Sequence, residues 1–324
     1  MIDRSTFTFI LLLLSQVIIA QNLNLDWVAQ LSPMGGSGIN YIEDIAIDRE
    51  ENTISVGTFS GQVDFDPSPS PSDTVFISSS PNVEAGFIHK LDSLGRLVWV
   101  KTIDFGIGPG PEALAIDQAD DIYITGEFRG TVDFDPGPLT NNLTSSQGDA
   151  FILKLSSNGD FRWAHNYTSS SGDGVTVGPR GNVYYSGSNN TSLFVIKLDS
   201  SNGSLIWRKN FTSSANGISF CPGITVDSSL NVYTSGYAHA DLDFDPSNFS
   251  VARIGTNRQA FVHKLDSNGN FVWVSKGLGT RSAGEDIVLS KDAKHIYTVG
   301  FHDTITSFYR QAYVDKWDQS GNLI

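Results

Sequence analysis

Short runs in which apolar and polar residues alternate recur along the whole chain. The runs are three to seven residues long, rich in Val, Ile, Tyr, Phe and Trp, and separated by Gly, Asn, Asp and Ser. A period of two residues with turn residues between the runs predicts short β-strands. No segment keeps a helical period of 3.6 residues. The pattern therefore predicts an all-β protein.

One phrase returns five times: an aromatic residue, two further strand residues, Lys, an apolar residue, and Asp or Ser. The copies lie at 86–92, 150–156, 193–199, 260–266 and 312–318. Two short apolar segments precede each copy, and a Trp segment follows each of the first four, at Trp99, Trp163, Trp207 and Trp273. Four short strands in a unit of this length predict the blades of a β-propeller.

We predict one propeller domain over residues 21–324. Its blades are expected at about 41–101, 112–165, 173–209, 222–275 and 285–324. The segment 25–30, which contains Trp27, resembles the fourth strand of a blade, but the first three strands do not precede it. This strand is expected to complete the fifth blade and so to remove an open sheet edge. The alternative is that the chain is a fragment of a larger propeller with six or seven blades.

A second phrase, Gly-x-Phe-x-Gly-x-Val-Asp-Phe-Asp-Pro, occurs in full at 57–67 and 126–136 and loosely at 236–246. Together with the Lys phrase, it resembles the SBBP family of β-propeller repeats, which are common in exported bacterial proteins. The resemblance implies a propeller fold and brings no catalytic residues. The third and fifth repeats lack the Asp-Phe-Asp-Pro sequence.

The first twenty residues have the pattern of a secretory signal peptide. Arg4 precedes an apolar stretch at 7–19, and Ala20 is a candidate cleavage position. We therefore predict a protein that is secreted, extracellular or on the cell surface, without membrane insertion after cleavage. If the source is eukaryotic, the Asn-x-Ser/Thr sequons are candidate glycosylation sites: Asn142, Asn166, Asn189, Asn190, Asn202, Asn210 and Asn248.

The charge balance restricts the partners. Acidic residues outnumber basic ones 35 to 21, and the net charge is −14. Without a run of Lys or Arg, a nucleic-acid partner is disfavoured. The expected partner is an extracellular protein or a glycan. The single cysteine, Cys221, excludes a disulfide within the chain, and we expect it to be a packing residue.

The repeated Lys lies in mid-strand, where its stem would cover apolar surface while its amine pairs with a carboxylate. The expected partners lie at the ends of the first strands: Asp48, Asp117 and Asp227.

The Asp-Phe-Asp-Pro phrase places two carboxylates two residues apart, on the same side of an extended segment. The pairs are Asp64 and Asp66, Asp133 and Asp135, and Asp243 and Asp245. Oxygen ligands of this kind suit Ca²⁺, with backbone carbonyls and water supplying the rest of the coordination. In the alternative interpretation, the Asp residues cap a loop and no cofactor is bound.

A second set of acids comes from the register of the repeats. The position before the first strand of each unit holds Glu43, Glu112, Asp173, Pro222 and Glu285. Because the first strand is innermost in a propeller, the four acids are expected to surround one mouth of the central channel. Such a ring would raise the pKa of its members or attract a cation, an amine or a polyol.

The leading functional interpretation is a secreted, non-enzymatic binding or structural propeller. The alternative is a carbohydrate-active enzyme that uses the acids at the channel mouth, because glycoside hydrolysis needs two carboxyl groups at a defined separation. The acids repeat with the blade, as structural residues do, and this favours binding over catalysis.

Overall fold

The computed structural model describes most of the chain after the N-terminal segment. The described residues are 26–33, 40–68, 74–79, 84–105, 108–168, 170–189, 191–212, 219–238, 242–247, 258–304 and 307–324. The predicted signal peptide lies outside them. The described part of the chain has no apolar helix long enough to cross a membrane.

The alternating segments form antiparallel sheets in which sequential strands are neighbours. Four of the blades consist of four strands each, in the predicted order. The first blade contains β2 (Asn40–Ile47), β3 (Thr53–Phe59), β6 (Ala85–Leu91) and β7 (Leu97–Ile103). The second contains β8 (Gly110–Ile116), β9 (Ile122–Asp133), β10 (Asn142–Leu155) and β11 (Phe161–Thr168). The third contains β12 (Ser171–Val177), β13 (Val183–Ser188), β14 (Ser192–Leu198) and β15 (Leu205–Thr212).

The fourth blade contains β16 (Phe220–Val226), β17 (Val232–Ala238), β18 (Gln259–Leu265) and β19 (Phe271–Lys276). The strands of the fifth are β20 (Thr280–Leu289), β21 (His295–Thr304) and β22 (Ser307–Asp318). A bridge between Trp317 and Leu323 begins its fourth strand, in the register that pairs Leu265 with Phe271 in the fourth blade. A small sheet beside the first blade contains β1 (Ser32–Pro33), β4 (Gln62–Asp64) and β5 (Phe76–Ser78).

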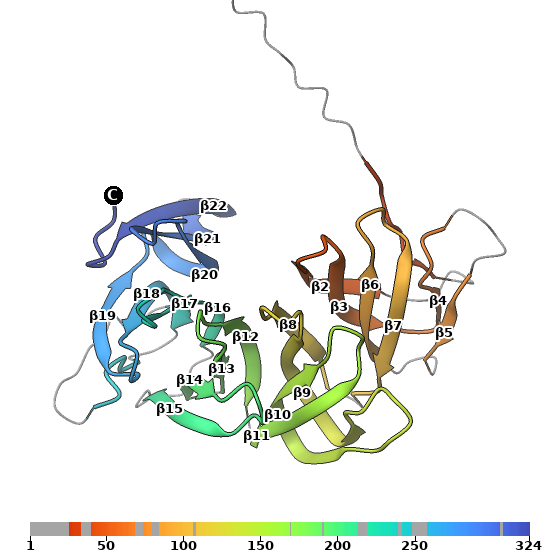
Figure 1. Ribbon diagram of the computed structural model, residues 1–324. Coiled ribbons are helices and arrows are strands. Elements are labelled where there is room, and N and C mark those ends of the chain that lie inside the picture. Colours follow the sequence, from red (N-terminus) through yellow and green to blue (C-terminus); the bar gives the residue numbers. More distant parts are fainter. Residues whose placement is uncertain are drawn as a thin grey trace, which may run out of the picture.

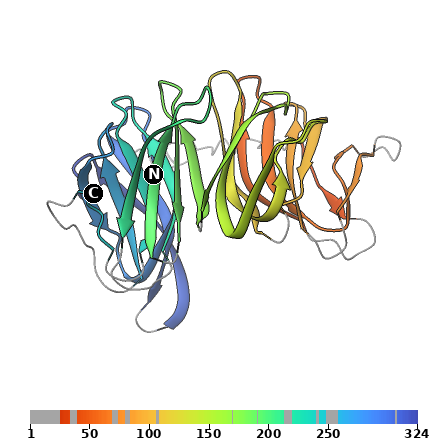
Figure 2. The ribbon, with the colours of Figure 1, turned by 90° about the horizontal axis from the view of Figure 1, so that it is seen from below.

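The five blades follow one another around a central axis, and the chain is a five-bladed β-propeller (Figure 1). The first strand of each blade lies nearest the axis, and β2, β8, β12, β16 and β20 contact one another in that order. Figure 2, a view from below, shows the sheets of successive blades packed face to face. This arrangement confirms the predicted fold class.

Each blade also contacts the next through its fourth-strand Trp and the glycine turn that follows the Lys strand. The Nε1 of Trp163 donates to the carbonyl of Ser200 at 3.1 Å, and that of Trp273 to the carbonyl of Gln319 at 3.1 Å. A Cβ on Gly203 would lie 2.8 Å from the indole of Trp163, and one on Gly321 would lie 2.8 Å from that of Trp273. The turn therefore requires glycine for packing as well as for its positive φ.

Trp27 occupies the same place beside the first blade. Its Nε1 donates to the carbonyl of Ser93 at 3.2 Å, and its ring covers Gly95. The prediction that it is a fourth-strand Trp is thus supported by its packing. The predicted ladder between residues 25–30 and the fifth blade is not among the strand pairs of the described residues, and Leu323 takes the first position of that strand.

One sheet face of the fifth blade is apolar and exposed, at positions that are buried in the other blades. Val314 of β22 is 72% exposed, whereas the residues at its register position in the other blades are at most 2% exposed: Ile88, Ile152, Val195 and Val262. On the first blade, Ile45 of β2 is 59% exposed, whereas its counterparts are at most 8% exposed: Leu114, Val175, Ile224 and Ile287. These two faces lie at the two ends of the series of blades.

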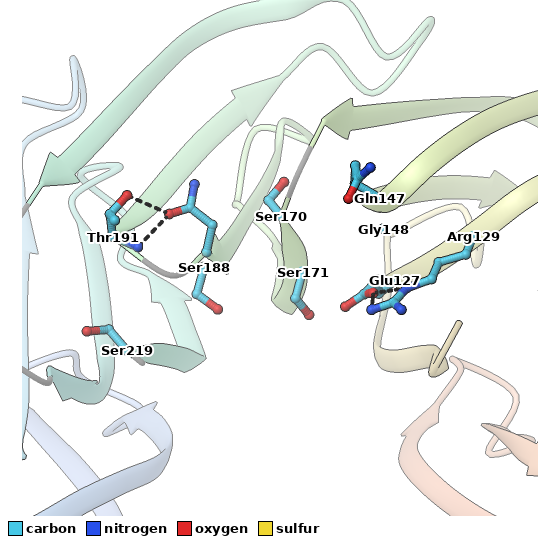
Figure 3. A pocket seen from close by; sticks show the side chains of 10 residues that line it. Glu127, Arg129, Gln147, Gly148, Ser170, Ser171, Ser188, Thr191 and Ser219 are labelled. Carbon is cyan, nitrogen blue, oxygen red and sulfur yellow. Dashed lines mark hydrogen bonds and ion pairs between the residues drawn. The ribbon is translucent and has the colours of Figure 1, made fainter. Parts of the chain in front are cut away.

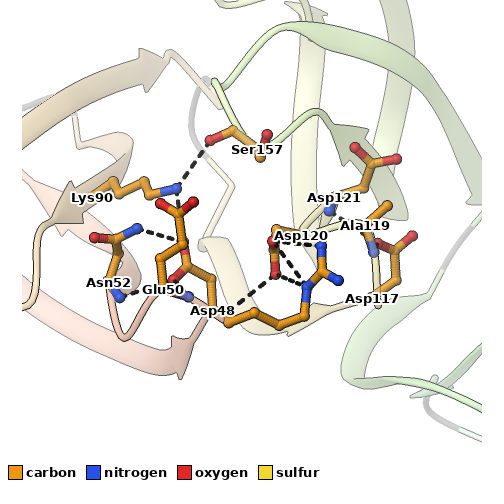
Figure 4. Close-up of polar contacts among 10 residues, drawn as sticks. Asp48, Glu50, Asn52, Lys90, Asp117, Ala119, Asp120, Asp121 and Ser157 are labelled. Carbon is orange, nitrogen blue, oxygen red and sulfur yellow. Dashed lines mark hydrogen bonds and ion pairs between the residues drawn. The ribbon is translucent and has the colours of Figure 1, made fainter.

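Three of the repeated lysines, Lys90, Lys154 and Lys264, donate to the next blade, and Figure 4 shows the contacts of Lys90. Lys90 pairs with Asp48 at 2.9 Å and donates to the carbonyl of Ser157 in the second blade, which confirms the first predicted pair. Lys154 lies 3.8 Å from the predicted Asp117 but pairs at 2.9 Å with Asp121.

The third predicted pair is replaced by another contact. Lys264 donates to Gln319 of the fifth blade at 2.9 Å, while the carboxylate of Asp227 accepts from Asn231 and Tyr233. Each of these lysines begins in the middle of a strand, and its ammonium group reaches an oxygen at the edge of a blade. The long apolar stem of lysine makes this possible.

Candidate functional site

A β-bulge interrupts the first strand of every blade near the channel. Ile42 and Asp44 pair with consecutive residues of β3, so Glu43 is the extra, unpaired residue. The same two-against-one pairing leaves Glu112, Asp173 and Glu285 unpaired in their strands, and the two residues Cys221 and Pro222 in β16. A bulge turns a side chain away from the regular alternation. The acids predicted from the repeat register are therefore the bulge residues.

The bulges depend on a glycine in the second strand of each blade. A Cβ on Gly57 would lie 1.9 Å from the carbonyl oxygen of Tyr41, and one on Gly126 would lie 2.0 Å from that of Gly110. The corresponding glycines of the other blades face the same obstacle: Gly187, Gly236 and Gly300. A glycine within a strand is a known mark of a bulge or of close backbone approach.

The bulge residues line one cavity at the channel mouth, which we call the channel-mouth pocket. Its volume is about 370 Å³, and it is lined by Glu43, Asp44, Glu112, Ala113, Leu114, Asp173, Val175, Pro222, Ile224, Glu285 and Asp286. An adjoining cavity of about 300 Å³ shares Glu43, Glu112, Asp173 and Pro222 with it. The structure thus brings together the five positions that the sequence register predicted.

Two acids of the pocket were not predicted. Asp44 and Asp286 follow Glu43 and Glu285 directly, and a regular strand would turn successive side chains to opposite faces. The bulge removes this alternation, so both members of each pair reach the pocket. The mid-strand glycines are the sequence signal that could have indicated it.

Three of the acids also connect blades. The carboxylate of Asp44 accepts a hydrogen bond from the amide of Leu114 at 2.8 Å, and that of Asp173 accepts from the amide of Cys221 at 2.9 Å. Glu112 accepts from the hydroxyl of Ser171 at 3.3 Å. These contacts hold the carboxylates in place, so the pocket is preformed.

Burial and mutual repulsion change the proton affinity of the pocket. Burial, opposed by the Ser171 hydrogen bond and assisted by the charges of Glu127 and Glu43, raises the pKa of Glu112 to about 7. Burial, together with the charge of Glu112, also raises the pKa of Asp173 well above its ordinary value. Burial outweighs the amide hydrogen bonds of Asp44 and raises its pKa too. Ionising all the carboxyl groups of the pocket at once therefore costs free energy.

The Glu112→Gln variant tests this cost. Because the folded protein holds the Glu112 proton up to about pH 7 and the unfolded chain releases it near 4.5, stability falls as the pH rises between these values. Glutamine removes this loss and can still accept from Ser171. We expect the free energy of unfolding to rise by about 1–3 kcal/mol at about pH 8 and to change little at about pH 4.

Urea denaturation of both proteins across this pH range measures the difference. Glu50→Gln, at an exposed turn, is the matched control and should leave the curve unchanged. A gain for Glu112→Gln that does not vary with pH would contradict the assignment.

The Asp-Phe-Asp-Pro residues cap their own loops. Asp64 accepts from the amides of Asp66 and Val75, and Asp133 accepts from those of Asp135 and Asn141. The remaining first and second Asp of each phrase accept from amides two residues ahead: Asp66, Asp135, Asp243 and Asp245. Within the described residues, no three His, Cys, Asp or Glu side chains meet in a way that could hold a metal ion. The carboxylates accept hydrogen bonds from loop amides, which agrees with the loop-cap alternative. Ca²⁺ binding by an Asp pair with backbone carbonyls and water stays a prediction.

Cys221 and His89 are buried packing residues. Cys221 is buried, and burial raises the pKa of its thiol, so it is held in the unreactive form. The Nε2 of His89 lies 2.9 Å from the carbonyl oxygen of Phe65, in the segment between β4 and β5. The side chains of Cys221 and His89 are not among those that line the channel-mouth pocket.

No protein-family model matches this chain, and no curated protein matches it. Solved structures resemble it in fold. A protein from Lactobacillus plantarum is 13% identical, with 87% of this chain and 83% of that chain covered and a TM-score of 0.46. The PQQ domain of pyranose dehydrogenase from Coprinopsis cinerea is 12% identical, with 91% and 82% covered and a TM-score of 0.43. A GH43 β-1,3-galactosidase is 9% identical, with 86% and 91% covered and a TM-score of 0.42.

Fold and site together define this protein as a β-propeller with an acidic pocket at the mouth of its channel.

Proposed function

We propose that the protein is an extracellular, non-enzymatic binding propeller whose channel-mouth pocket binds the ammonium group of an organic cation. The observation that carries this proposal is the convergence of six carboxyl groups from four blades on one cavity, with no basic residue among those that line it. A bound cation relieves the repulsion among these acids, which is a source of binding free energy that a neutral ligand lacks.

The shape of the pocket favours an organic cation over a metal ion. Its volume of about 370 Å³ is that of a small-molecule site, and Leu114, Val175 and Ile224 supply apolar wall beside the acids. A ligand with an ammonium group on a hydrocarbon chain, such as a lysine side chain of a partner protein or a free diamine, uses both kinds of wall.

The secreted location rests on the signal-peptide pattern at residues 1–20. The non-enzymatic role rests on the repetition of the acids: four of the six are bulge residues at the same register position of their blades. Asp44 and Asp173 are in addition engaged with backbone amides of the next blade. Carboxyl groups that hold neighbouring blades together have a structural role, and this favours binding over catalysis.

Isothermal titration of the purified protein with cadaverine tests the proposal. We expect binding that weakens about fivefold or more in Glu43→Gln and in Glu112→Gln, because each variant removes one charge from the cation's surroundings. Glu50→Gln, on the outside of the first blade, is the control and should bind like the wild type. Affinity should also fall between about pH 8 and pH 6 as Glu112 takes up its proton. The absence of heat, or equal affinity of all four proteins, would overturn the proposal.

A carbohydrate-active enzyme is the second candidate, favoured by one observation. A carboxyl group with a pKa of about 7, as at Glu112, suits a general acid, and Glu43 and Asp173 line the same cavity as candidate partners. A panel of chromogenic glycosides distinguishes the two functions. Turnover that Glu112→Gln abolishes would establish the enzyme and overturn the non-enzymatic role.

A further inference from the structure

A second cavity lies between the second and third blades, and we call it the inter-blade pocket. Its volume is about 520 Å³, and it is lined by Glu127, Arg129, Gln147, Gly148, Ser170, Ser171, Ser188, Asn189, Thr191 and Ser219. Figure 3 shows these side chains around a common open space, with Ser171 between Ser188 and Glu127. The sequence analysis did not predict this pocket.

Every residue that lines the inter-blade pocket is polar or glycine. Hydroxyl groups and side-chain amides can each donate and accept hydrogen bonds, as the hydroxyls of a sugar do. Arg129 and Glu127 form an ion pair at 3.1 Å and place donors next to acceptors at one wall. This composition suits a ligand covered with hydroxyl groups, because every lining side chain other than that of glycine carries a hydrogen-bonding group.

The inter-blade pocket and the channel-mouth pocket share a wall. The hydroxyl of Ser171 in the former donates to Glu112 of the latter at 3.3 Å, and that of Ser188 donates to Asp173 at 3.1 Å. The charge of Glu127 also contributes to the raised pKa of Glu112, which agrees with their proximity. A ligand in the inter-blade pocket would therefore lie beside Ser171 and Ser188, whose hydroxyls contact Glu112 and Asp173 directly.

We infer that the two pockets together bind an amino sugar or its short oligomer. The hydroxyls of the ligand occupy the inter-blade pocket, and its ammonium group lies at Glu112 and Asp173. The ammonium part rests on the proposed function, whereas the hydroxyl part rests on the composition of the inter-blade pocket alone. Neither a simple amine nor a neutral sugar makes both sets of contacts.

Titration of the purified protein with three probes tests this inference: the trisaccharide of glucosamine, cadaverine and maltotriose. We expect the glucosamine trisaccharide to bind about tenfold or more tightly than either of the other two, because it combines the contacts of both pockets. N-acetylation of the trisaccharide removes the charge and should reduce its affinity to that of maltotriose.

Variants separate the two parts. The double variant Gln147→Ala and Arg129→Ala removes two donors from the inter-blade pocket, and we expect the affinity for the glucosamine trisaccharide to fall about fivefold or more with that for cadaverine unchanged. Gln118→Ala, in an exposed turn of the second blade, is the matched control. Glu112→Gln should weaken both ligands.

The possible failures are distinct. If cadaverine binds but the trisaccharide binds no more tightly, or if the double variant has no effect on it, the amino-sugar inference is overturned and the proposed function stands. If maltotriose binds as tightly as the glucosamine trisaccharide while cadaverine gives no heat, both the ammonium site and the amino-sugar assignment are overturned. Thermal melts of each variant verify that it is folded.

Discussion

Replacing Phe134 by alanine is expected to lower the free energy of unfolding by about 3–5 kcal/mol. Phe134 comes from the Asp-Phe-Asp-Pro phrase and is fully buried between the first and second blades. Its ring lies 5.1 Å from those of Phe128 and Phe151 and 5.8 Å from that of Phe105, centre to centre. Alanine leaves a cavity that the surrounding strands cannot close, because each is held by its own ladder.

Chemical denaturation followed by Trp fluorescence measures this loss. The matched control is Phe76→Ala in β5, whose side chain is 42% exposed and whose removal should cost less than about 1 kcal/mol. Equal losses in the two variants would contradict the expectation that Phe134 stabilises the contact between the first and second blades.

Replacing Lys90 by methionine is expected to cost about 2–4 kcal/mol, because it leaves the carboxylate of Asp48 buried without its counter-charge. The two groups are 2.9 Å apart, with side chains 9% and 2% exposed. Burial by itself would raise the pKa of Asp48, but hydrogen bonds from Lys90 and Asn52 outweigh it and hold the pKa below its ordinary value.

The pH dependence follows from this direction. A carboxyl whose pKa is lower in the folded protein contributes stability above its ordinary pKa and loses it as the pH falls through the folded value. The difference between wild type and Lys90→Met should therefore shrink below about pH 4. The lysine of the third blade supplies a matched control, since Gly178 occupies the position that Asp48 holds in the first.

Lys197 lies over the ring of Tyr184, and burial lowers its pKa. Lys197→Met should change the stability by less than about 1 kcal/mol, because burial of an ammonium group offsets what its contacts contribute. A loss as large as that of Lys90→Met would show that the pairing with Asp48 is not the source of the loss, because methionine keeps the apolar stem in both variants.

Much of the fold could be predicted from local patterns. Alternation specified the strands, turn glycines such as Gly95 and Gly269 marked the boundary between the third and fourth strands, and the repeat specified the propeller. The partners of the repeated lysines were harder to predict. Lys154 prefers Asp121 over the predicted Asp117 because the turn between β8 and β9 brings Asp121 closer to its amine.

The candidate site was predicted in part. The register correctly grouped Glu43 with Glu112, Asp173 and Glu285, because residues at equal positions of successive blades face the same axis. It missed Asp44 and Asp286, because the two-residue alternation of a regular strand does not apply at a bulge. The inter-blade pocket was missed entirely, since its hydroxyl residues come from separate strand ends and loops with no common spacing.

By itself, the sequence determined that this protein is an all-β propeller with acids at equal positions of its blades, because strand alternation, turn chemistry and repeat length are local properties. Only the tertiary structure decided which carboxylates share a pocket, which of them are engaged with the next blade, and where Trp27 packs. Those outcomes depend on distances between residues far apart in the chain. These distances are fixed only when the sheets pack against one another.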